Sequence, residues 1–95
     1  MSFRLVILLK AQTEMADAVD WYELQQIGLG ERFILFMEDF ITRIVQNPLH
    51  FPEKTPPFRE AYAKDFPYLV IYQVHNDEVV IYSVFHIKQN PKKKY

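Results

Sequence analysis

The chain has 95 residues, no cysteine, a formal net charge of −1, and an apolar content of 49% with 16% aromatic residues. This length and composition predict one globular domain over residues 1–95 and exclude an intrinsically disordered chain. Without cysteine the chain cannot form a disulfide framework, a thiolate zinc site or a thiol nucleophile, which is typical of proteins in a reducing cytoplasm. The apolar run 3–9 is too short, and too charged at Arg4, to predict a signal peptide or a membrane span.

Charge is distributed unevenly along the chain. Residues 11–47 contain seven acids and two bases, whereas residues 48–95 contain seven bases and five acids, with four lysines among the last eight residues. A nucleic-acid-binding domain usually carries a stronger basic excess on one face. The sequence therefore indicates only a modest cationic surface, confined to the second half of the chain, and we expect the tail 91–95 to be frayed.

The first half of the chain predicts a strand followed by two helices. The β-branched and apolar run 3–9 predicts a mostly buried strand. Thr13 is expected to cap a helix with one apolar face, and Gly28 to end that helix in a left-handed conformation. A second helix is expected to begin near Leu29 and to end before Pro48. The apolar faces are Met15, Ala18, Val19 and Tyr22 in the first helix, and Phe33, Phe36, Met37, Phe40, Ile41, Ile44 and Val45 in the second.

The second half predicts a loop and an antiparallel sheet. Three prolines and the absence of periodicity indicate a loop over residues 49–57. Residues 58–65 are expected to form an edge or near-edge strand, followed by a turn at Phe66-Pro67-Tyr68. Residues 69–74 and 79–85 predict two strong strands joined by a hairpin turn at Asn76-Asp77.

This order of elements predicts an α+β domain. It consists of an N-terminal strand, an antiparallel helical hairpin and a three-stranded antiparallel meander, with the helices packed on one face of the sheet. The first strand has to join the sheet to satisfy its backbone groups, most simply beside the last strand.

The residues that carry acid–base or metal chemistry form few patterns. His50, His75 and His86 share no metal-ligand spacing, so no metal site is expected, and no motif for a cofactor or phosphate group is present. His86 ends the last predicted strand and is followed by Lys88. A strand-end histidine beside a cation could act as an acid or base near neutral pH, although such a residue is more often only half exposed.

Two other residues have a structural and a functional interpretation. Tyr22 is expected in the core, whereas Trp21 lies roughly 90° away around the helix and is expected at a rim where a partner docks. Arg59 is either a salt-bridged strand residue or a cation directed at a phosphate or at a partner's carboxylate.

A set of short motifs runs in order through nearly the whole chain. It comprises Asp17-Ala18, Trp21-Tyr22-Glu23, Gly28-Leu29-Gly30-Glu31-Arg32-Phe33, Asn47-Pro48, Arg59, Phe66-Pro67-Tyr68, Tyr72, Val84 and His86. No single motif is specific, but the ordered set resembles the ParE/RelE superfamily, the toxin half of bacterial type II toxin–antitoxin pairs, often called plasmid stabilisation proteins. The match is closer to the ParE-like branch.

The resemblance implies two alternative activities. ParE-like members poison DNA gyrase and are neutralised by a cognate antitoxin, whereas RelE-like members cut messenger RNA on the ribosome. This chain has apolar Leu69 or Val70 where RelE-like nucleases carry an arginine, and Lys88 stands where many relatives have arginines after the position of His86. These differences favour the ParE-like toxin, which is a protein-binding toxin rather than an enzyme; a degenerate, non-toxic binding module is a third alternative.

Each alternative uses its own set of side chains. For a nuclease, the groups available for acid–base work and charge stabilisation are Arg59, His86, Lys88 and Tyr95. For a partner-binding toxin, the resemblance implies that an antitoxin tail wraps the helical hairpin and an exposed part of the sheet. The expected contacts on that surface are Trp21, Arg59, Tyr68 and Lys88, with antitoxin acids paired to Arg59 and Lys88.

Overall fold

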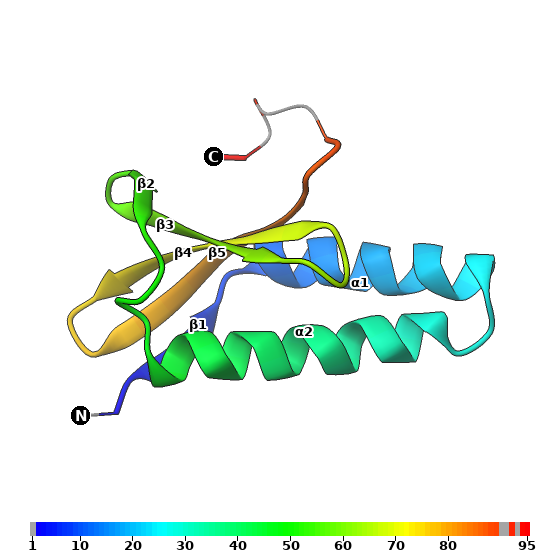
Figure 1. Ribbon diagram of the computed structural model, residues 1–95, viewed down its shortest axis with the longest axis horizontal. Coiled ribbons are helices and arrows are strands. Elements are labelled where there is room, and N and C mark those ends of the chain that lie inside the picture. Colours follow the sequence, from blue (N-terminus) through cyan, green and yellow to red (C-terminus); the bar gives the residue numbers. More distant parts are fainter. Residues whose placement is uncertain (1, 90–91, 93) are drawn as a thin grey trace.

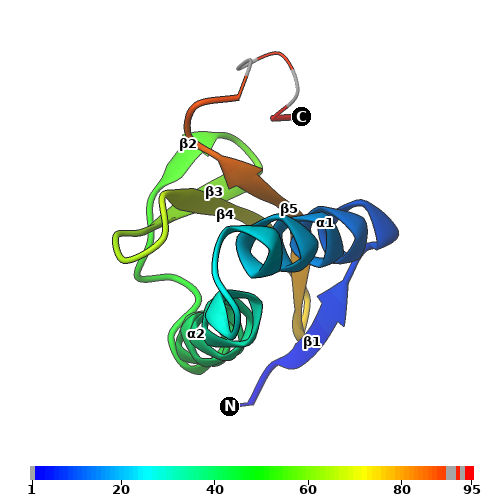
Figure 2. The same ribbon diagram turned by 90° about the vertical axis from the view of Figure 1, so that its right-hand side faces the viewer.

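The computed structural model describes residues 2–89, 92, 94 and 95. Its elements are β1 (Arg4–Ile7), α1 (Leu9–Gln25), α2 (Leu29–Gln46), β2 (Glu53–Thr55), β3 (Phe58–Ala63), β4 (Tyr68–His75) and β5 (Glu78–His86). The strands form one sheet in the order β1-β5-β4-β3-β2 (Figure 1). Figure 2 shows the two helices end-on, packed as a hairpin on one face of this sheet. The α+β class and the one-sided helical layer are as predicted.

The first strand differs most from its prediction. β1 lies beside β5, as expected, and pairs with it in parallel from Arg4↔Glu78 to Ile7↔Ile81, so the sheet is mixed. It has only four residues, however, and Arg4 and Leu5 are exposed. The prediction of a mostly buried strand over 3–9 is therefore wrong. β1 is an edge strand with one neighbour, and the chain turns into α1 immediately after it.

The segment expected to be a loop contains the short strand β2. Glu53 pairs with Arg59 and Thr55 with Phe58, so the predicted three-stranded meander gains a fourth strand. All three residues of β2 are exposed, and for this reason the strand left no alternating pattern in the sequence. β3 is consequently a near-edge strand. The hairpin between β4 and β5 is where it was predicted, with Asn76 at a positive φ of 56°.

The helix boundaries show which caps the fold uses. α1 begins at Leu9, ahead of the predicted Thr13 cap, and Leu8 at the N-cap provides no side-chain hydrogen bond. Instead, the Leu8 N–H donates to the carbonyl oxygen of Ile81 (3.0 Å), so pairing with β5 sets the start of the helix. Gly28 is left-handed as predicted, at φ 89°, but it is the N-cap of α2, whereas Gln26 is the C-cap of α1. α2 itself spans the predicted residues.

The two helices are locked together at their hinge. The Glu23 carboxylate accepts hydrogen bonds from the backbone N–H groups of Gly28 (2.9 Å) and Gly30 (3.0 Å), at the positive end of α2. A Cβ atom on Gly30 would lie 2.6 Å from the carbonyl oxygen of Val19. The crossing of the helices thus requires glycine at position 30, and Glu23, seven residues earlier, serves as the cap of α2.

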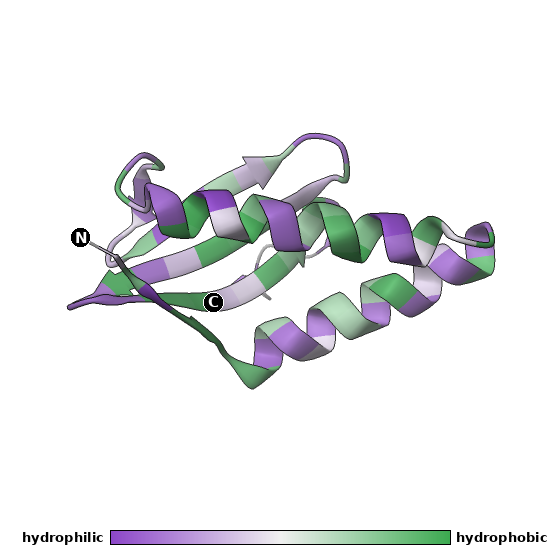
Figure 3. Ribbon diagram, turned by 90° about the horizontal axis from the view of Figure 1, so that it is seen from below, coloured by the Kyte–Doolittle hydropathy of each residue, from purple (hydrophilic) through white to green (hydrophobic). Residues whose placement is uncertain are grey.

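The core lies between the helices and the sheet. Phe33, Met37 and Ile44 of α2 are fully buried, and Tyr22 of α1 stacks on Phe33 with ring centroids 5.2 Å apart. Figure 3 shows apolar and polar positions alternating around α2, as expected for a helix with one buried stripe. Tyr22 is 9% exposed and Trp21 57%, so the predicted division between a core tyrosine and a rim tryptophan is confirmed.

The last residues contact the face of the sheet opposite the helices. Lys94 Nζ lies 2.9 Å from Glu60 Oε2, and the Tyr95 hydroxyl donates to the same carboxylate. The Tyr95 ring also packs on Phe58, with centroids 5.1 Å apart. Glu60 and Phe58 thus contact Lys94 and Tyr95, and the expected fraying of the tail stays a prediction; Pro91 and Lys93, in the same tail, lie outside the described residues. Within the described chain, neither helix has the length and apolar content needed to cross a bilayer.

Candidate partner-binding site

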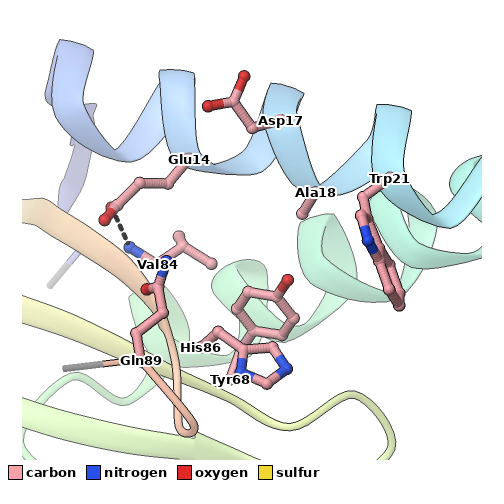
Figure 4. A pocket seen from close by; sticks show the side chains of 8 residues that line it. All are labelled: Glu14, Asp17, Ala18, Trp21, Tyr68, Val84, His86 and Gln89. Atoms are coloured by element: carbon pink, nitrogen blue, oxygen red, sulfur yellow. Dashed lines mark hydrogen bonds between the residues drawn. The ribbon is translucent and has the colours of Figure 1, made fainter.

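A pocket of about 350 Å³ lies between α1 and the adjacent ends of β4 and β5. Figure 4 shows Glu14, Asp17, Ala18 and Trp21 along the helix, above the strand residues. Among the described residues, the lining consists of Glu14, Asp17, Ala18, Trp21, Tyr68, Val84, His86 and Gln89. Two of the predicted partner contacts, Trp21 and Tyr68, therefore share one pocket with the candidate acid or base His86.

The pocket exists because β1 is shorter than β5. β1 pairs with β5 only as far as Ile81, so the remaining edge of β5 has no strand beside it. α1 takes that place: Glu14 Oε1 accepts hydrogen bonds from the Val84 N–H (2.9 Å) and the buried Ser83 hydroxyl (2.8 Å). Lys10 Nζ completes the cluster by binding Ser83 Oγ (2.9 Å) and Glu14 Oε2 (3.2 Å). A carboxylate thus satisfies a strand edge that would otherwise be open.

A bulge in β5 sets which residues face the helix. The register with β4 shifts between Ile71↔Ser83 and Tyr72↔Ile81, so β5 contains one extra residue at this point. Val79 and Ile81 face the core before the bulge, and Val84 faces it afterwards. The shift brings Val84 and His86, rather than their neighbours, under α1.

His86 lies at the end of the pocket with a defined environment. Its ring meets the Tyr68 ring edge-on, with centroids 5.0 Å apart, and its Nδ1 atom accepts a hydrogen bond from the Lys88 N–H (3.0 Å). The proton of the neutral ring is therefore assigned to Nε2. Burial, and then the charge of Lys88, lower the pKa of His86 below its ordinary value. Both effects favour the neutral imidazole.

The two aromatic walls of the pocket differ in exposure. Trp21 packs edge-on against Tyr22 at 5.1 Å and leaves most of its indole accessible. Tyr68 is only 7% exposed, and Figure 4 shows its hydroxyl directed toward α1. Burial raises the pKa of Tyr68, and the neighbouring Tyr22 and Glu14 add to that rise. Tyr68 is thus a neutral hydrogen-bonding group at the base of the pocket.

Arg59 lies elsewhere and is bound within the fold. It pairs with Tyr72 across β3 and β4; its Nη1 donates to the carbonyl oxygen of Phe51 (2.6 Å), and its Nη2 lies 3.9 Å from Glu53. The Tyr72 hydroxyl donates to the carbonyl oxygen of Pro48 (2.5 Å), and burial raises the pKa of Tyr72 to about 12. The pair holds the segment after α2 against the sheet. As an antitoxin contact, Arg59 stays a prediction.

The four nuclease candidates are not assembled into one site. Arg59 is opposite Tyr72 and His86 is opposite Tyr68, four residues apart along β4, or about 13 Å at strand spacing. Tyr95 is bound to Glu60, which neighbours Arg59 in β3 and therefore points to the other face. Only Lys88 is close to His86. Among the described residues, no group of three or more His, Cys, Asp or Glu side chains is placed to hold a metal ion.

Of the eight described residues that line the pocket, the sequence analysis named Trp21, Tyr68 and His86 as candidates and missed the other five. The helical part carried a signal, because Glu14, Asp17, Ala18 and Trp21 recur at helical spacing and share one face of α1. Val84 had appeared only as part of the family pattern, and Gln89 had no signal. Their position depends on the bulge and on the short partner strand, which no local pattern encodes.

Comparison with known proteins identifies the chain. A sequence profile described as "ParE toxin of type II toxin-antitoxin system, parDE" matches residues 5–91. The chain belongs to the ParE toxin family. Among solved structures, one reported as the chromosomal ParDE toxin–antitoxin system from P. aeruginosa is similar in fold, with a TM-score of 0.71 at 16% identity over 92% of this chain and 98% of that one. No curated protein matches this ParE-family chain in sequence.

Proposed function

We propose that this ParE-family chain is a cytoplasmic toxin that inhibits DNA gyrase and is held inactive by a cognate antitoxin. Membership of the ParE family over residues 5–91 is the observation that carries the proposal. The dispersal of the nuclease candidates supports a toxin that acts by binding rather than by cutting RNA. Trp21, with most of its indole accessible beside a pocket, supports a protein partner.

The antitoxin contact is proposed at the pocket and along the hairpin. Trp21 and Tyr68 supply the aromatic surface, and exposed Lys88 at the end of β5 is available to an antitoxin acid. Leu24 and Ile27 extend the apolar surface toward the hinge, where they are 84% and 93% exposed. Exposed apolar side chains of this size, grouped on one part of a small domain, are typical of a surface that a partner covers.

The test is inhibition of purified gyrase. Increasing amounts of the folded chain should reduce supercoiling or trap cleaved DNA, and the antitoxin encoded in the neighbouring reading frame should restore activity. No effect at saturating folded protein would refute gyrase as the target. Toeprinting on translating ribosomes tests the alternative, since codon-dependent cuts would assign the chain to ribosome-dependent messenger RNA cleavage instead.

A further inference from the structure

The charged side chains that line the pocket, among the residues that the structure describes, are both acidic. They are Glu14 and Asp17, and the neutral form of His86 is favoured because burial and Lys88 lower its pKa. The two carboxylates are not equivalent. Glu14 is bound to Ser83, Val84 and Lys10, whereas exposed Asp17 has neither a hydrogen bond nor an ion pair with any described residue. The pocket therefore has a free negative charge at its rim.

The walls of the pocket suit a flat cation. The Trp21 indole is largely accessible and lies one turn of α1 after Asp17. Figure 4 shows the indole directed toward the strands, where Tyr68 provides a second aromatic ring, and the Asp17 carboxylate at the outer side of the helix. Aromatic faces attract cations, tryptophan most strongly, and a guanidinium also stacks on them through its own plane. A carboxylate from a partner would instead approach the unpaired Asp17 against its charge.

We propose that the pocket binds an arginine side chain of the antitoxin, with the guanidinium stacked on Trp21 and paired with Asp17. The proposal rests on the proposed function, because it names the antitoxin as the source of the arginine. It also predicts the orientation in which an antitoxin segment binds to this surface. Lys88 lies beyond His86 on the strand side and accepts an acidic residue, while the helix side accepts a basic one. An antitoxin segment carrying both charges then fits in one orientation only.

The chemistry of the pocket can be tested without any partner. Trp21 is the only tryptophan in the chain, so its fluorescence and its indole N–H resonance report directly on the pocket. Benzamidinium, a flat aromatic cation, should shift both signals in a saturable way, and benzoate, the matched anion, should not. Stronger binding of benzoate, or no response to benzamidinium up to its solubility limit, would overturn the proposal.

Two matched variants separate the pocket from general charge effects. Asp17→Asn removes the free carboxylate of the lining and should weaken benzamidinium binding about twofold to fivefold, the range for one exposed ion pair. Asp20→Asn makes the same change one turn along α1, outside the lining, and should leave binding unchanged. Equal effects of the two variants would reduce the interaction to the overall charge of the helix and refute a built site. Both positions are exposed, so neither change should unfold the chain.

A second measurement keeps this proposal separate from the proposed function. Asp17→Lys should weaken binding of the antitoxin tenfold or more, because it places a cation where the arginine would bind, whereas Asp20→Lys should have a small effect. If the antitoxin binds and Asp17→Lys changes nothing, the arginine pocket is refuted and the proposed function stands. If benzamidinium binds as expected but no antitoxin does, the proposed function fails and the preference of the pocket for cations stands.

Discussion

The hinge of the helical hairpin and the pocket beside β5 both use residues of α1. The hinge residues are bound within the fold, whereas the pocket residues remain accessible to a partner. At the hinge, Tyr22, Glu23 and Gly30 are committed to other parts of the fold: one ring stacks on Phe33, one carboxylate caps α2, and one glycine permits the crossing. At the pocket, Asp17 and Trp21 of the same helix keep their charge and aromatic surface accessible. Within the ordered set of motifs, Tyr22, Glu23 and Gly30 therefore have structural roles, whereas Asp17 and Trp21 of the same set remain available to a partner.

The hinge is most directly broken at Gly30. Gly30→Ala should lower the free energy of unfolding by about 3 kcal/mol, the upper end for overpacking, because the new Cβ would meet backbone at Val19 rather than a flexible side chain. Chemical denaturation measures the loss. Gly28→Ala is the control, since no atom lies within 4 Å of its Cβ and only the left-handed backbone is strained. It should cost about 1–2 kcal/mol. An equal or larger cost at Gly28 would show that the crossing is not the limiting contact.

Arg59 tests whether one residue can both stabilise the fold and bind a partner. Arg59→Ala should lower stability by about 1–3 kcal/mol, because it removes a charged donor from the Phe51 carbonyl oxygen. If Arg59 also meets the antitoxin, affinity should fall by a further amount of about 1–3 kcal/mol. Denaturation and titration calorimetry on the same variant separate the two terms. Unchanged affinity with an intact fold would leave Arg59 with its structural contacts alone.

Trp21 should contribute to antitoxin binding and little to the stability of the free chain. Trp21→Ala should reduce antitoxin affinity by about 1 kcal/mol or more, as for an aromatic anchor at an interface, while the stability of the free chain changes less. Calorimetric titration and thermal unfolding measure the two effects. Tyr22→Ala, one position along, is the matched comparison and should mainly destabilise the fold. A Trp21 variant that unfolds readily but binds normally would contradict the division between the two regions.

The smallest expected effect is the pH dependence contributed by His86. Its pKa is lowered in the folded state by burial and by Lys88, so the unfolded chain binds the proton more readily. The stability due to the neutral ring is therefore complete above the unfolded pKa of about 6.5, and it is lost as the pH falls below that value toward the folded pKa. His86→Gln should make the unfolding midpoint less sensitive to pH between about 7 and 5.5 than in the parent chain. The same sensitivity in both proteins would contradict this linkage.

Local patterns were sufficient for most elements and for the division of α1 into faces. The apolar stripe of α2 and the Asn76 turn were predicted because helical spacing and turn chemistry are short-range signals. The start of α1 was wrong because a backbone hydrogen bond to Ile81 replaces the expected Thr13 cap. The hydrogen bond from Arg59 to the Phe51 carbonyl oxygen could not be predicted either, since it depends on a segment that returns from the end of α2.

The sequence by itself determined the family, the order of elements and the presence of an exposed tryptophan beside a core tyrosine. The tertiary structure alone decided that β1 stops at Ile7, that Glu14 covers the edge of β5 beyond it, and that a bulge turns Val84 and His86 toward α1. The physical reason is the separation in sequence between the residues that make contact. Helical faces and turns arise from contacts between near neighbours, whereas the pocket is formed by groups about seventy residues apart that meet only when the sheet has closed.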